Sequence, residues 1–400
     1  MSLLKKIVIH DYAGHVFAIH LARILANEYE VHYICATGLE TPQGKVVKSD
    51  HDSKNLHIHK IKLNQKYKKN KYSFIKRWAY EKEYGKKIKI KLLEINPDVI
   101  TSANTPTEIQ SYIISASKKC RAKFIYWLQD FYSIAVKKLL KKKSIFLSST
   151  VGNYYKYLDK KHFSEAEKII AISINFKKIL ITSFKIKPKK IEVIQNWSPI
   201  NELPILSKRN EWSKNNKLTN KFVFMYSGTL GMKHNPEYLL KLSQYFQKIS
   251  NVEIVVVSEG IGRSYLEKKK KELQLKNMSL FDYAPYSKLP EILSTADVFI
   301  ALLEKSAGQF SVPSKVLTYH VFGKPTLISA PAENQASKLI KEEDSGIATT
   351  PGDYTAFLKS ANELFNNKDL QTRQSLNSRD YALRAFSDQS IKMKFKDIFL

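Results

Sequence analysis

Short apolar runs, separated by polar turns and by segments with helical spacing, recur along the first half of the chain. Those with the length and composition of buried strands are residues 7–10, 31–36, 98–101, 123–128 and 168–173. Residues 17–26 show the apolar spacing of a helix that follows the first of these strands. Because strands that alternate with helices form a parallel sheet covered on both faces, the first half predicts a doubly wound α/β domain.

The second half repeats this alternation after a polar, proline-containing segment at residues 196–220, which we interpret as the connection between domains. Its predicted strands are residues 222–226, 253–257, 279–281, 297–302, 326–329 and 346–349. We therefore predict Rossmann-like domains at residues 1–198 and 199–378 that face each other across a cleft. The amphipathic segment 379–400 is predicted to be a C-terminal helix that packs back on the N-terminal domain.

The segment Gln309 to Ser329 predicts a loop, a helix, a tight turn and a buried strand in direct succession. Pro313 fits the first helical turn, and Ser311 or Ser314 is placed to cap the helix. Gly323 is placed to end it before the next strand. A helix that opens beside a polar loop directs its unpaired N–H groups toward a ligand, so this segment predicts a diphosphate seat.

A glycine-containing turn in the sequence YSGTLGMKHNPE follows the first strand of the second domain. Its glycines permit positive φ and close approach of the backbone to a ligand, and Lys233 can reach a phosphate or sugar oxygen. A simple β-α turn with a solvated lysine is the alternative interpretation. The predicted diphosphate-binding residues are Gly228, Thr229, Gly231, Lys233, Ser314, Lys315 and Val316.

Two further loops of the second domain predict contacts with a nucleoside. The sequence SEGIGR follows a strand without completing GxGxxG, and FDYAPY offers tyrosines on which a base can stack. Simple turn chemistry and core packing are the alternatives. The predicted nucleoside-binding residues are Glu259, Gly260, Gly262, Arg263, Tyr283 and Tyr286.

In the first domain, polar residues follow two predicted strands at the edge where ligands of doubly wound sheets bind. His15 comes after the first strand and Asp130 after a later one. His15 is either a cleft residue or a core or capping histidine, and Asp130 either a catalytic or acceptor-binding group or a helix cap. With Lys233 they are the predicted catalytic residues. The predicted cleft and acceptor residues are Gly14, His15, Asp130 and Asn196.

The charge of the chain is unusual, because 66 Lys and Arg against 37 Asp and Glu give a formal net charge of +29. Basic residues are densest in 60–91, 137–143 and 185–190. An anionic membrane surface or a lipid-linked acceptor, a lysine-rich composition with no specific partner, and nucleic acid are all consistent with this excess. The basic runs lack zinc-finger spacing and RNP-type motifs, which argues against nucleic acid. Aromatic residues interleave with them at Tyr72, Phe74, Trp78 and Tyr80.

Cys35 and Cys120 are the two cysteines and show no metal-ligand spacing, so the expected compartment is a reducing cytoplasm. No stretch reaches the ~20 apolar residues of a membrane span, so any membrane contact is expected to be peripheral, at the inner face of the cytoplasmic membrane. Asp50 and Asp52 form a DxD sequence without further metal-site pattern. The histidines show no HExxH pattern, and we expect no bound metal and no cofactor.

Taken as a set, these segments resemble retaining glycosyltransferases of family 4, which have the GT-B fold. The resemblance rests on YSGTLGMKHNPEYL, SEGIGRSYLE, APYSKLPEILSTADVFIALL, SVPSKVLTYHVFGKPTLIS, HDYAGHVFAIHLARIL, WLQDFY and IQNWSPINELP. It implies transfer of a sugar from a nucleotide sugar, with UDP as the expected nucleotide, to a lipid-linked or polysaccharide acceptor of bacterial surface glycans. It also implies retention of configuration and catalysis without metal.

The chain departs from the family pattern at three positions. Lys233 matches the family's lysine, but the arginine expected near Thr229 is absent, and the two glutamates expected near Phe310 and Thr318 are also absent. A subgroup that resembles capsule, O-antigen and colanic-acid transferases carries PSK here, which Ser314 and Lys315 match. The alternatives are a nucleotide-sugar 2-epimerase of the same fold and a non-catalytic basic protein that binds membranes or RNA.

Overall fold

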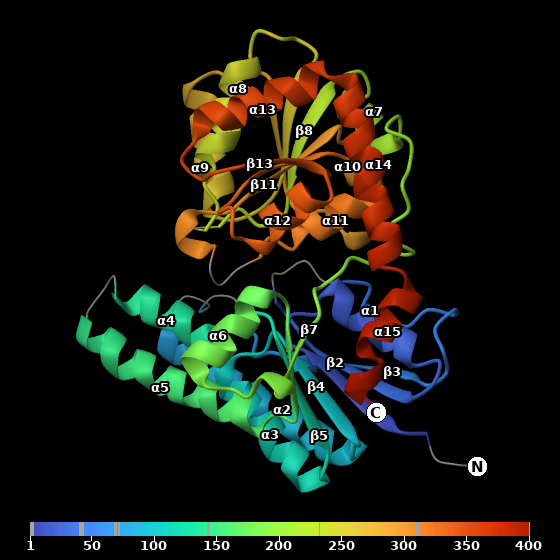
Figure 1. The fold of residues 1–400 in the computed structure, drawn as a ribbon, viewed down its shortest axis with the longest axis vertical. Coiled ribbons are helices and arrows are strands. Elements are labelled where there is room, and N and C mark those ends of the chain that lie inside the picture. The colour runs from blue at the N-terminus through green and yellow to red at the C-terminus, as the bar shows by residue number, and fades with distance from the viewer. Residues whose placement is uncertain are drawn as a thin grey trace. The chain divides into compact units, whose positions relative to one another are not determined.

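The chain forms two compact units in the computed structural model, and each unit is built on one parallel sheet (Figure 1). The structure describes residues 4–39, 44–67, 70, 73–141, 145–231, 233–308 and 312–399. The first unit comprises Met1–Gln195 and Ile391–Leu400, and the second comprises Asn196–Ser390. The predicted fold of two doubly wound α/β domains is therefore confirmed.

The sheet of the first unit has seven parallel strands in the order β3-β2-β1-β4-β5-β6-β7. The strands are β1 Lys6–Asp11, β2 Glu30–Thr37, β3 Leu56–Lys62, β4 Val99–Ala103, β5 Lys123–Leu128, β6 Lys168–Ala171 and β7 Ile191–Val193. The order reverses between β1 and β4, which places the ligand-binding edge of such a sheet at the carboxyl ends of these two strands.

Helices cover both faces of this sheet. They are α1 Val16–Leu25, α2 Phe74–Ile95, α3 Thr107–Cys120, α4 Tyr132–Lys141, α5 Ile145–Glu165, α6 Ile174–Phe184, the 3-10 turn η2 Pro188–Lys190, and α15 Asp388–Phe399. Phe17 of α1 and Phe395 of α15 both pack edge-on against the buried ring of Trp127, with centroids 5.2 and 5.3 Å away. The two helices therefore share one face, and in Figure 1 the red α15 lies beside α1. Tyr126 packs against Phe163 of α5 on the opposite face.

The sheet of the second unit has six parallel strands in the order β10-β9-β8-β11-β12-β13. They are β8 Phe222–Ser227, β9 Val252–Val257, β10 Met278–Phe281, β11 Val298–Leu302, β12 Thr326–Ser329 and β13 Gly346–Thr349. The other elements are α7 Glu211–Asn215, α8 Glu237–Phe246, α9 Ile261–Glu272, η3 Tyr286–Lys288, α10 Leu289–Ser294, η4 Lys305–Ala307, α11 Lys315–Val321, α12 Gln335–Glu342, α13 Tyr354–Asn366 and α14 Lys368–Ala385. Here the strand order reverses between β8 and β11.

Three local expectations differ from the structure. Residues 196–220 belong to the second unit and contain α7, whose first turn is capped by the Asn210 side chain accepting from the Ser213 N–H at 2.9 Å. The segment 379–400 is not one helix, because α14 ends before Phe386 and α15 starts at Asp388. Pro313 precedes α11 instead of lying in its first turn, since the N-cap residue is Ser314.

Candidate active site

Two glycine-containing turns meet at the carboxyl ends of β8 and β9. The N–H of Gly228 donates to the carbonyl of Val257 at 3.0 Å, and the N–H of Leu230 donates to the carbonyl of Glu259 at 3.1 Å. The N–H of Gly262 returns a hydrogen bond to the Leu230 carbonyl at 2.9 Å. A Cβ on Gly262 would lie 2.6 Å from the Leu230 Cγ, so this close approach requires glycine. The two turns thus hold each other in place.

Lys315 of α11 extends under the first of these turns. Its Nζ lies 3.5 Å from the centroid of the Tyr226 ring, near the end of β8. Gly228 has φ of +121°, and a Cβ there would lie 3.1 Å from both Cε and Nζ of Lys315. Gly228 is therefore needed both for its backbone conformation and for the space that the lysine occupies.

The ammonium group of Lys315 is buried and finds no hydrogen-bond partner among the residues that the structure describes. Burial, and then the charge of Lys233, hold the pKa of Lys315 well below its usual value. The ring face of Tyr226 stabilises the cation by a cation–π contact, but a ring face supplies no hydrogen-bond acceptor oxygen. The Lys315 amino group, held over the Tyr226 ring, therefore forms a preformed binding site for an anion.

His234 keeps the turn in shape as a neutral imidazole. Its Nδ1 accepts from the N–H of Gly231 at 3.1 Å, and the backbone N–H of His234 donates to the Gly231 carbonyl at 3.0 Å. Burial, followed by the charges of Lys315 and Lys233, lowers the pKa of His234 to about 3. The ring is therefore uncharged near neutral pH and can accept this hydrogen bond.

Tyr319 fixes α11 against the end of β8. Its hydroxyl accepts from the N–H of Ser227 at 3.0 Å, and its ring stacks on Phe299 with centroids 4.0 Å apart. Because Tyr319 lies one helical turn after Lys315, these contacts also fix the direction from which the lysine reaches the turn.

The predicted nucleoside-binding residues lie beside the glycine-containing turn after β8 or further along the same edge of the sheet. The hydroxyls of Tyr283 and Thr229 lie 2.6 Å apart, and burial raises the pKa of Tyr283 to about 12. The hydroxyl of Tyr286 donates to Glu202 at 3.2 Å. Arg263 forms ion pairs with Glu267 and Asp282, each at 3.1 Å.

Several predicted residues have local roles that the sequence did not reveal. Ser314 is exposed and its side chain makes no capping hydrogen bond, while Ser311 lies outside the described residues. The N–H of Val316 is already engaged with the Pro313 carbonyl at 3.2 Å. Gly260 caps α9 with φ of +102°.

Gly231 does not use the conformation expected of it, because its φ is not in the positive range that favours glycine. Lys233 is exposed, and its backbone carbonyl accepts from the N–H of Glu304 at 3.0 Å. Thr318, one of the two positions where an acidic residue was expected, donates its hydroxyl hydrogen to Ser198 at 3.2 Å. Phe310, the other position, lies outside the described residues.

In the first unit, His15 is paired with a buried carboxylate. Its Nδ1 lies 3.1 Å from Oδ2 of Asp11, its backbone N–H also donates to Asp11, and its ring stacks on Phe17. Burial lowers the pKa of His15, but the charges of Asp11 and then Asp130 outweigh this effect and raise the pKa above its usual value. The structure thus brings His15 and Asp130 to the same edge of the sheet.

The other two predicted cleft residues are placed by backbone and burial. Gly14 has φ of +77°, and its N–H closes the turn after β1 on the Asp11 carbonyl at 3.1 Å. Asn196 is buried and belongs to the second unit. Asp52 of the DxD sequence accepts from Arg23 Nε at 2.9 Å and from the Ser49 N–H at 2.8 Å, so this carboxylate has a structural role.

Four residues of these sites were not identified from the sequence: Asp11, Tyr226, His234 and Tyr319. Asp11 had a usable signal, because it ends a strand four residues before His15. Tyr319 had a weaker one, since it is spaced one helical turn from Lys315. Tyr226 and His234 read as ordinary strand and turn residues, and their roles follow only from the folded positions.

Comparison with known proteins assigns a family model to each half of the chain. Residues 14–200 match the model of Glycosyltransferase Family 4, and residues 207–381 match that of Glycosyl transferases group 1. A protein of Escherichia coli (strain K12) named for colanic acid biosynthesis glycosyl transfer, WcaI, is 24% identical over 205 residues. This match covers 50% of the chain and 49% of that relative, so it spans about half the length of the curated relative.

Solved structures match over almost the whole chain. Anabaena HepE, crystallised with UDP and glucose, aligns with a TM-score of 0.70 at 15% identity, covering 99% of each chain. WaaG, a glycosyltransferase of lipopolysaccharide biosynthesis, aligns with a TM-score of 0.69 at 12% identity, covering 98% of each chain. These similarities establish the two-domain fold of GT-B glycosyltransferases.

Proposed function

Since the chain belongs to the glycosyltransferases of family 4, with a group 1 model matching its second half, we propose that it transfers a sugar from a UDP-sugar to an acceptor in bacterial surface glycan synthesis. The acceptor is lipid-linked or a growing polysaccharide. The colanic acid name of the E. coli relative and the lipopolysaccharide role of WaaG support this class of acceptor. The UDP complex of HepE supports the choice of nucleotide.

One observation carries the proposal: the buried ammonium of Lys315 has no hydrogen-bond partner among the described residues. A buried charge that lacks a partner is costly, and such groups concentrate at ligand sites. A nucleoside diphosphate would supply the missing negative charge and the acceptor oxygens. Lys315 lies beside the glycine turn where β8 ends, which is the ligand-binding edge of a doubly wound sheet.

Lys315 and Lys233 would stabilise the diphosphate leaving group. When the bond between sugar and diphosphate breaks, negative charge grows on the leaving oxygen while the sugar becomes oxocarbenium-like. Lys315 from below and Lys233 from the exposed side of the turn would stabilise that charge, at about 3 kcal/mol for each well-placed donor. With two ammonium groups in this role, we propose that the reaction needs no metal, and that it proceeds with retention as is usual in the family.

The nucleoside would lie against the second turn. Tyr283 is held next to the diphosphate turn by its contact with Thr229, and its half-buried ring offers a stacking face. Glu259 and Arg263 flank this position on the loop and first turn of α9, where they can contact a ribose or base. This arrangement gives the nucleotide two polar neighbours and one aromatic neighbour.

The acceptor is assigned to the first unit. His15, oriented by Asp11, and the exposed Asp130 can both hydrogen-bond to a hydroxyl, and Asp130 can accept the proton that the acceptor loses. The positive φ of Gly14 brings the backbone close to this edge of the sheet.

Peripheral contact with an anionic membrane is part of the proposal, because apolar and basic side chains are exposed together on α2. The side chains of Ile75 and Trp78 are 77% and 38% exposed, and Lys82 Nζ lies 3.8 Å from the Trp78 ring centroid. Within the part of the chain that the structure covers, no helix combines the length and apolar character needed to cross a bilayer. Tyr72 lies outside the described residues.

A nucleotide panel followed by a transfer assay tests the proposal. UDP at about 100 times its Kd should raise the free energy of unfolding by about 2.7 kcal/mol, and CMP or ADP should raise it less. UDP-sugars incubated with lipid extract should give a product heavier by one sugar, with or without EDTA. No response to any nucleoside diphosphate would refute the assignment of the Lys315 site.

Lys233→Ala should lower kcat/KM by roughly 100-fold, because it removes one donor to the leaving oxygen. Lys241→Ala is the matched control, since Lys241 is a partly exposed lysine of the second unit that lies on α8 near Tyr354. Unchanged turnover in the Lys233 variant would remove this residue from the mechanism.

A further inference from the structure

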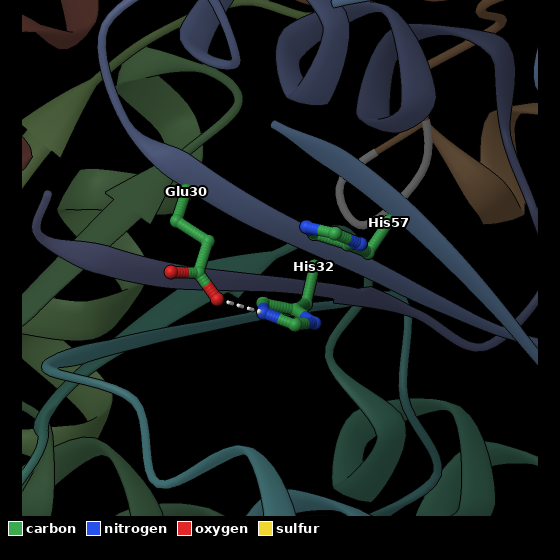
Figure 2. A group of neighbouring side chains, drawn as sticks. All are labelled: Glu30, His32 and His57. Atoms are coloured by element: carbon green, nitrogen blue, oxygen red, sulfur yellow. Dashed lines mark hydrogen bonds and ion pairs between the residues drawn. The ribbon is translucent and has the colours of Figure 1, made fainter. Parts of the chain in front are cut away.

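Two histidines and a glutamate lie close together where strands β2 and β3 begin, at the opposite ends of the strands from the proposed acceptor residues. Glu30 and His32 lie at the start of β2, and His57 lies at the start of the edge strand β3 (Figure 2). Strand register pairs His32 directly with His57. Parallel strands share their amino ends, so this cluster lies at the edge opposite His15, which follows the carboxyl end of β1.

The ligand atoms of these three side chains are close enough for one metal ion. One nitrogen or oxygen from each residue lies within 4.8 Å of the others, and His32 Nε2 is 3.0 Å from Glu30 Oε1. Zinc bonds of 2.0–2.1 Å in a tetrahedral site place ligand atoms about 3.3 Å apart. The His32 and His57 rings stack with centroids 4.7 Å apart, and His57 is exposed, so a turn of its side chain can close the remaining distance.

A third histidine, His59, orients the central ligand His32. His59 Nε2 lies 2.9 Å from His32 Nδ1, so His32 uses its Nδ1 for this contact and directs its Nε2 toward Glu30. Metal-bound histidines usually have a hydrogen bond of this kind at the second ring nitrogen.

We propose that Glu30, His32 and His57 bind a divalent transition metal of the zinc class and thereby fasten the edge strand β3 to β2. Two imidazoles and a carboxylate suit zinc and its neighbours better than magnesium or calcium, which prefer oxygen ligands. The ion takes the place of the hydrogen between His32 Nε2 and Glu30, and water fills the fourth position. This proposal revises the sequence-based expectation that the chain holds no metal.

Lys6 is the competing partner for the carboxylate. Its Nζ lies 3.9 Å from Glu30 Oε1, which is beyond hydrogen-bonding distance, and both side chains are about one-third exposed or more. Such a surface ion pair is weak, so a metal bond can displace it. Residues 57–60 also border an open surface hollow of about 390 Å³, which gives an ion access from solvent.

The test uses the full chain without an affinity tag, stripped with EDTA, dialysed and titrated with zinc by calorimetry. We expect one site per chain, and cobalt in its place should give the intense visible absorption of a tetrahedral site. His57→Ala should weaken zinc binding at least tenfold. His51→Ala is the matched control, because His51 is an exposed histidine outside the cluster, and should bind zinc as the unmodified chain does.

His59→Ala separates the orienting residue from the ligands, and should weaken binding 10- to 100-fold while keeping the tetrahedral cobalt spectrum. Equal zinc binding by the unmodified chain and His57→Ala would overturn the proposal, as would an octahedral cobalt spectrum. Zinc should raise the unfolding temperature of the first unit without being required for sugar transfer. The outcome is thus independent of the proposed function.

Discussion

Replacing Lys315 by methionine should make the protein more stable and a worse nucleotide binder. Methionine keeps most of the length of the lysine chain and packs well on the Tyr226 ring, but it removes a buried amino group that has no hydrogen-bond partner among the described residues. Leaving a buried polar group without a partner costs about 1–3 kcal/mol, more for a charged group. We expect the free energy of unfolding to rise by about this amount, which is several degrees in Tm for a unit of this size.

The effect on binding has the opposite sign. A hydrogen bond to a charged group contributes about 1.5–3 kcal/mol, so the affinity for UDP should fall roughly 10- to 150-fold. Thermal unfolding without nucleotide and calorimetric titration with UDP measure the two effects separately. A stability gain combined with a binding loss is the pattern expected where a site is built for function at the expense of stability.

Lys241→Met is the matched control for this experiment. Lys241 also lies over a tyrosine, with its Nζ 5.0 Å from the Tyr354 ring centroid, but its side chain is 37% exposed and contacts Glu237. Its replacement should change stability by no more than about 0.5 kcal/mol and leave UDP affinity unchanged. If Lys315→Met instead lowers stability and still binds UDP normally, Lys315 is a structural residue and the site assignment is wrong.

Three further predictions address binding and stability. Burial and the charge of Lys233 depress the pKa of Lys315, and an anionic ligand would raise this pKa again. UDP binding at a pH above the depressed pKa should therefore take up a proton, and the affinity should fall as pH rises through that pKa. Calorimetry in buffers of different ionisation enthalpy measures the proton uptake, and its absence would show that this reasoning is wrong. Gly228→Ala puts a Cβ 3.1 Å from Lys315 Nζ at φ of +121°, and should cost about 1–3 kcal/mol of stability and weaken UDP binding, whereas normal UDP affinity would contradict the close approach. Phe395→Ala removes a fully buried ring from Trp127 and should lower the free energy of unfolding of the first unit by about 3–5 kcal/mol, and urea denaturation with an unchanged midpoint would show that α15 does not stabilise this unit.

The strands buried on both faces could be predicted from the sequence because their apolar runs end at turn residues. Residues 123–128 and 326–329 agree with β5 and β12 at both ends. The edge strand β3, with sequence LHIHKIK, was missed because it is only partly buried and its histidines and lysines interrupt the apolar pattern. The short strand β7 was missed for a similar reason, since two of its three residues are half-buried.

The candidate site was predictable where a local rule applies and not where it depends on distant segments. Gly228 and Lys315 stand in recognisable turn and helix-start sequences. The contact between Tyr319 and Ser227 joins residues 92 positions apart, and no local pattern encodes it. The histidine cluster likewise depends on strand register, which pairs His32 with His57 across 25 positions.

The return of α15 to the first unit has a consequence for biosynthesis. A ribosome finishes the second unit before it releases the segment that carries Phe395, so the part of the Trp127 side that α15 covers beside α1 stays open throughout that time. The unit made first is therefore completed last, and nascent chains stalled after residue 390 should expose this surface to chaperones.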